Sequence, residues 1–126
     1  MGFEVLITDE AFDDLDVIAG IIQRQTTPEN ARNWFDEIID AIETLGEMPA
    51  RCRQAPEVED LQADIRLLLH GRRNRGYKIY FKIQHSESSD SVMVFHVRHW
   101  AREPLTNEEL EERTGERNEE PIDWKS

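Results

Sequence analysis

The basic side chains of this sequence are concentrated in one segment, where they could form a local basic face that holds an anionic group such as a phosphate. Residues 64–102 contain eight lysines and arginines but only three acidic residues. The whole chain has 27 acidic residues against 15 basic ones, and its formal net charge of -12 opposes non-specific attraction to nucleic acid. A local basic face is therefore the feature whose position in the fold matters most.

Alternation of apolar and polar residues predicts three strands in this region, over residues 65–70, 77–84 and 93–98, joined by polar turns at 70–76 and 85–90. Like charges on neighbouring strands repel each other, so cations gathered on one face favour a functional role. The structural alternative is pairing with the nine acidic residues of segment 101–126. The residues expected on this face are Arg66, Lys78, Tyr80, Lys82, His96 and Arg98.

The preceding residues predict a strand and a helix hairpin. Residues 3–7 are short and apolar, as in a strand, and Thr8 is an N-cap for a helix that runs to about Gln25. Thr27 and Pro28 begin a second helix, and a polar loop without periodicity follows over residues 49–63. The predicted fold is α+β, with the order β-α-α-β-β-β. The helix hairpin packs on one face of a small, mostly antiparallel four-stranded sheet.

Helical spacing assigns a buried and an exposed face to the first helix. Val17 and Ile21 fall outside the buried stripe, and an exposed apolar pair one turn apart favours contact with another protein, either a partner or a second copy of this chain. The acidic residues at the start of this helix are interpreted as a solvated surface that matches the helix dipole, and not as a metal cluster. The stripe expected in the core consists of Phe12, Leu15, Ile18, Ala19 and Ile22.

Composition limits the remaining possibilities. A single cysteine, Cys52, makes neither an intramolecular disulfide nor a cysteine zinc site, so we expect no metal and no cofactor. The longest apolar run, residues 17–22, is too short to cross a membrane, and the chain is expected to be cytoplasmic. Residues 1–104 are predicted to form one domain, and residues 105–126 an acidic C-terminal tail that is partly helical or flexible.

In this order and spacing, the motifs resemble the RelE/ParE superfamily, the toxins of bacterial type II toxin–antitoxin systems. The resemblance covers about residues 3–104 and implies the fold described above. It also implies a cognate antitoxin as partner, in a hetero-oligomer, with a homodimer as the other assembly that the sequence allows. It rests on Thr8–Leu15, on Thr27–Ala31 leading to Trp34, on Ala41–Leu45 before Pro49, on Asp64–Arg66, on Gly76–Phe81 and on Val94–Arg102.

Two activities occur in the superfamily. RelE-like members cleave messenger RNA on the ribosome and are enzymes, and the resemblance places Arg66, Lys78 and Arg102 at their cationic positions. The residues after Arg102 contain neither the Tyr nor the His that such members often have near the C-terminus. ParE-like members, often called plasmid stabilisation proteins, instead inhibit DNA gyrase and need no ribonuclease site.

Segments 27–31 and 97–102 look closer to the ParE branch, so the sequence favours a gyrase inhibitor. The mRNA endoribonuclease is the alternative, with ribosome and mRNA as its partners. A chain that kept the fold and antitoxin binding but lost toxicity is the second alternative. The expected target-binding residues are Arg98, His96, His99, Tyr80 and Arg73, and the expected partner-binding residues are Val17 and Ile21.

Overall fold

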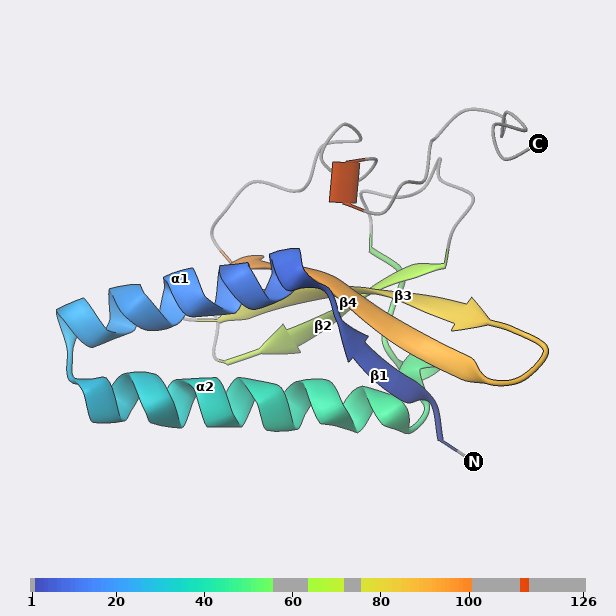
Figure 1. The fold of residues 1–126 in the computed structure, drawn as a ribbon, viewed down its shortest axis with the longest axis horizontal. Coiled ribbons are helices and arrows are strands. Elements are labelled where there is room, and N and C mark those ends of the chain that lie inside the picture. The colour runs from blue at the N-terminus through green and yellow to red at the C-terminus, as the bar shows by residue number, and fades with distance from the viewer. Residues whose placement is uncertain (1, 56–63, 72–75, 101–111, 114–126) are drawn as a thin grey trace.

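Two helices pack against one face of a four-stranded sheet in the computed structural model, which describes residues 2–55, 64–71, 76–100 and 112–113 (Figure 1). The chain begins with strand β1 (Glu4–Ile7) and continues into helices α1 (Asp9–Gln25) and α2 (Pro28–Glu43). Two short 3-10 turns follow, η1 (Thr44–Gly46) and η2 (Pro49–Arg51). Strands β2 (Ile65–His70), β3 (Tyr77–His85) and β4 (Asp90–His99) complete the sheet.

Both helices begin at the threonines that the sequence identifies. The Thr8 hydroxyl accepts the Ala11 N–H at 3.1 Å, and the Thr27 hydroxyl accepts the Asn30 N–H at 3.0 Å. Each hydroxyl satisfies an N–H that has no partner within the first helical turn, which fixes where the helix starts. Pro28 occupies the first turn of α2, where its missing N–H costs nothing.

The sheet has the order β1-β4-β3-β2. Strand β1 runs parallel to β4, and the other two pairs are antiparallel, so the predicted mostly antiparallel α+β fold is confirmed. Beyond β2, residues 53–55 lie along the outer edge of the sheet, where the Leu67 N–H donates to the Arg53 carbonyl at 3.1 Å. This pairing covers an edge that would otherwise expose backbone groups.

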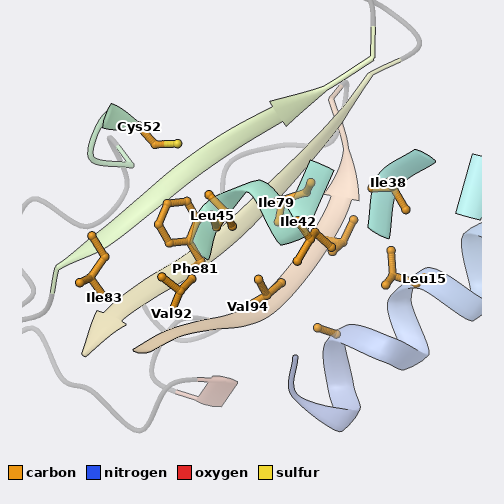
Figure 2. Close-up of a cluster of buried hydrophobic side chains, with 12 residues drawn as sticks. Leu15, Ile38, Ile42, Leu45, Cys52, Ile79, Phe81, Ile83, Val92 and Val94 are labelled. Atoms are coloured by element: carbon orange, nitrogen blue, oxygen red, sulfur yellow. The ribbon is translucent and has the colours of Figure 1, made fainter. Parts of the chain in front are cut away.

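The main hydrophobic core fills the space between the helices and the sheet. Figure 2 shows Leu15 of α1 and Ile38 and Ile42 of α2 directed toward side chains of β3 and β4. The predicted burial of Leu15 is confirmed, but Phe12 is 42% exposed, and Ala11 lies fully buried in the core cluster. The stripe of α1 that packs on the sheet is therefore rotated away from Phe12.

A β-bulge in β4 changes which residues share a face. Tyr80 pairs with His96 and Phe81 pairs with Val94, so Phe95 is an extra residue in β4. Phe95 and His96 consequently both lie with Tyr80 on the face opposite the helices. The strict alternation expected through residues 93–98 is wrong at this point, because one inserted residue reverses the phase of the strand.

Strand β2 also differs from expectation. Its register pairs Arg66 with Phe81 and Leu67 with Tyr80, and directly paired residues point to the same face. Arg66 therefore lies on the helix-facing side, and its expected place on the basic face is wrong. Ile65 and Leu67 instead lie on the second face, where they form a small apolar cluster with Ala55, Tyr80 and Phe95.

The described part of the chain contains no helix that is long and apolar enough to cross a membrane. Within the same residues, no group of three or more His, Cys, Asp or Glu side chains could hold a metal ion.

Candidate functional site on the second sheet face

The second sheet face, opposite the helices, brings together four of the expected site residues. Lys78 pairs with Arg98 and Tyr80 pairs with His96 across β3 and β4. The His96 and Tyr80 rings lie 5.8 Å apart between centroids. Tyr80 has no exposed surface, and Lys78, His96 and Arg98 are 9%, 7% and 5% exposed. The expected grouping of these residues is therefore right, but they lie below the surface.

A hydrogen bond joins the side chains of Arg98 and His96. The Arg98 Nε–H donates to His96 Nε2 at 2.8 Å. Because the guanidinium group has only donors, His96 Nε2 must carry the lone pair, and the proton of the neutral ring lies on Nδ1. Nδ1 in turn faces a carboxylate oxygen of Asp14 at 3.4 Å. Asp14 of α1 therefore lies close to His96, although no hydrogen bond joins the two side chains.

Asp14 has a further role at the edge of β4. Strand β1 ends beside Val94, so within the residues that the structure describes no strand pairs with the following residues of β4 on that side. The Val97 N–H donates instead to Asp14 Oδ2 at 3.0 Å. Asp14, which is 18% exposed, therefore satisfies a backbone donor next to the bulge. The interpretation of Asp14 as a merely solvated residue is wrong.

Arg113, 99 positions further along the chain, also binds Asp14. Its guanidinium donates to both carboxylate oxygens of Asp14, at 3.1 and 3.3 Å, and to the Phe95 carbonyl at 3.0 Å. Glu10 lies 3.5 Å from Arg113 Nε. Burial alone lowers the pKa of Arg113, but the hydrogen bond to Asp14 and the charges of Asp14, Glu10 and Glu112 outweigh it, so that the pKa is raised.

The remaining expected site residues are dispersed. His99 pairs with Tyr77, and its ring contacts the Tyr77 ring at 5.3 Å on the helix-facing side, away from Lys78 and Arg98. The Arg66 guanidinium is directed to Asp64 and to the carbonyls of Ala50 and Cys52, so it holds the segment that follows α2. Arg73 and Arg102 lie outside the described residues.

Val17 and Ile21 lie exposed on α1, as the helical spacing predicts, with exposed fractions of 62% and 38%.

Sequence reasoning missed Asp14 and Arg113 as a pair. The spacing of Asp14 from Val17 and Ile21, three and seven residues, was the one available signal that these residues share a helix face. Nothing in the sequence connects Arg113 with Asp14, 99 positions away.

The fold, two helices on a four-stranded mixed sheet, is also that of a chain from a known toxin–antitoxin system. The chain superposes on a chain of the chromosomal ParDE toxin–antitoxin system from P. aeruginosa with a TM-score of 0.63, covering 77% of this chain and 95% of that one. At 17% sequence identity, this similarity establishes the fold alone.

Sequence comparison provides the family. Residues 5–104 match the family model described as the ParE toxin of the type II toxin–antitoxin system parDE. The chain therefore belongs to the ParE toxin family. No curated protein sequence matches it.

Proposed function

We propose that this chain is the toxin of a type II toxin–antitoxin pair, that it inhibits DNA gyrase in the cytoplasm, and that a cognate antitoxin neutralises it. The family match over residues 5–104 supports the toxin assignment. The choice of gyrase over messenger RNA depends on the position of one side chain, Arg66.

Ribonuclease activity would require cations that converge on one phosphate. In this chain, Arg66 Nη1 donates to the Cys52 carbonyl at 2.6 Å and to the Ala50 carbonyl at 3.2 Å, on the helix-facing side. Lys78 pairs with Arg98 on the second face. Arg66 and Lys78 therefore do not share a face, and this observation favours inhibition of a protein target over RNA cleavage.

Of the expected target-binding residues, we keep Arg98 and His96 on the second sheet face as the proposed contact with gyrase, and we add Lys78 because it pairs with Arg98. Because these residues are buried, contact requires a rearrangement that exposes them. Tyr80 is completely buried and packs with Phe95 and His96, so we assign to it a supporting role and no direct contact. His99 lies on the other side of the sheet and is not part of the proposed contact.

The first test is an SOS reporter in cells that express this chain alone, measured beside culture density. We expect a strong rise of the reporter together with growth arrest, because gyrase trapped on cleaved DNA breaks the chromosome. Arrest with a silent reporter would refute gyrase inhibition and point to messenger RNA cleavage. Normal growth would show that the chain is not toxic.

The second test uses purified gyrase and supercoiled plasmid, with linear DNA as the readout. Arg98→Ala is expected to weaken inhibition, whereas Arg32→Ala, which removes the same charge from an exposed position on α2, is the matched control. Thermal melting of both variants separates loss of contact from loss of fold. Equal inhibition by two folded variants would remove Arg98 from the proposed contact.

A further inference from the structure

Four residues of α1 form a stripe with two chemically different halves. Glu10, Asp14, Val17 and Ile21 are spaced by four, three and four residues, so they lie along one side of the helix. We call them the acidic–apolar stripe. Its N-terminal half, Glu10 and Asp14, is acidic, and its C-terminal half, Val17 and Ile21, is apolar and exposed.

A side chain of the same chain, Arg113, already occupies the acidic half of the stripe. Arg113 donates two hydrogen bonds to Asp14 and one to the Phe95 carbonyl, which is the paired geometry that distinguishes an arginine from a point charge. Figure 1 shows residues 112–113 as the short red segment near the N-terminal end of α1. The acidic half therefore holds the guanidinium group of Arg113.

The apolar half is not covered by this contact. Val17 is 62% exposed and Ile21 is 38% exposed. The distance along the helix from Asp14 to Ile21 is about 10 Å at 1.5 Å per residue. A segment that covered the whole stripe would place an arginine on Asp14 and, about three extended residues or two helical turns away, a large apolar side chain on Ile21.

Arg113 lies beyond residue 104, where the match to the family model ends. Its contact with α1 and β4 therefore comes from outside the residues that match the family model. It is also a basic residue in a segment with nine acidic residues, and it meets the most acidic region of the sequence, residues 1–47. Charge complementarity therefore favours the contact between Arg113 and Asp14.

We propose that Arg113 is an intramolecular competitor for the acidic–apolar stripe, and that an arginine-bearing segment of the antitoxin covers this stripe only after displacing Arg113. This inference rests on the proposed function, because it takes the antitoxin as the second occupant. The antitoxin also contacts the apolar half of the stripe, which Arg113 leaves exposed. This additional contact allows the antitoxin to replace Arg113. Arg113 thereby regulates how rapidly the toxin is neutralised.

The test is the association rate of the full-length toxin with its cognate antitoxin, measured by surface plasmon resonance. When a binding-competent state is populated only in part, apparent binding is reduced by that fraction. If the site is open for between a tenth and a third of the time, Arg113→Ala is expected to associate roughly three- to tenfold faster than the native toxin. Arg32→Ala, which changes the net charge equally, is expected to match the native rate.

The double variant Asp14→Asn with Arg113→Ala tests whether faster association comes from loss of the contact between Arg113 and Asp14. Asp14→Asn keeps a carbonyl oxygen for the Val97 N–H but loses the charge that holds Arg113. In the Asp14→Asn background, Arg113→Ala is therefore expected to change the rate less than twofold. Full acceleration in that background, or no acceleration by Arg113→Ala in the native background, would overturn the inference while antitoxin binding itself persists. If no variant binds the antitoxin, the proposed function fails, and the inference fails with it.

Discussion

Replacing Asp14 by alanine tests whether one side chain on α1 stabilises the bulged edge of β4. In the native protein, Asp14 accepts the Val97 N–H at 3.0 Å and binds Arg113. Val97 is 3% exposed, so its N–H would lose its partner in a place that water reaches poorly. An unsatisfied buried donor costs about 1 to 3 kcal/mol.

The contact with Arg113 adds less, because both side chains are about one-fifth exposed and are screened by solvent. We therefore expect Asp14→Ala to lower the free energy of unfolding by about 2 to 3 kcal/mol. Asp14→Asn is the matched control: its carbonyl oxygen can still accept the Val97 N–H, and it should cost about 1 kcal/mol or less.

Urea unfolding followed by circular dichroism measures both changes. Hydrogen exchange at the Val97 amide is the local readout, and it should accelerate in Asp14→Ala but only slightly in Asp14→Asn. The reasoning would be refuted if Asp14→Ala were as stable as the native protein, or if the asparagine variant lost as much stability as the alanine variant.

Three further outcomes are expected. Thr27→Ala removes the N-cap of α2 and should cost about 1 kcal/mol in urea unfolding, whereas an unchanged midpoint would show that packing alone fixes the start of this helix. The double variant Val17→Lys with Ile21→Lys should leave the free energy of unfolding within about 0.5 kcal/mol of the native value, because both side chains are exposed. It should weaken antitoxin binding measured by calorimetry. Unchanged affinity and oligomer size would contradict the assignment of a partner surface. Burial raises the pKa of the Cys52 thiol above 9.0, so the thiol stays protonated at neutral pH, and its contribution to stability is lost only as pH rises through that raised value. The thiol should therefore react with a thiol reagent slowly in the native state and completely in denaturant. Rapid reaction in the native state would show that the segment around Cys52 opens.

The positions of the helices follow from local rules that the sequence displays. Thr8 and Thr27 cap the two helices because a hydroxyl three residues before an unpaired N–H satisfies it wherever the rest of the chain lies. The exposure of Val17 and Ile21 follows from the helical period alone. The order of the elements then restricts the fold to helices on one face of a sheet.

The site depends on contacts that no local pattern contains. Arg66 was expected beside Lys78 because simple alternation was carried across three strands. The register of β2 against β3 instead placed Arg66 with Phe81, and the bulge at Phe95 changed the phase of β4. Burial of side chains from several strands together sets a register, so a single strand does not reveal it.

The sequence by itself therefore determined which segments are helices and strands, where the helices begin and that Val17 and Ile21 of α1 remain exposed, but not the exposure of Phe12. The tertiary structure alone decided which face Arg66 occupies, how deeply Tyr80 and Arg98 are buried and that Arg113 binds Asp14. Capping and periodicity act over a few residues, within one turn or one strand. Asp14 meets Val97 and Arg113 across 83 and 99 positions, and such contacts form only when the packing of the whole domain offsets the entropy of closing the chain.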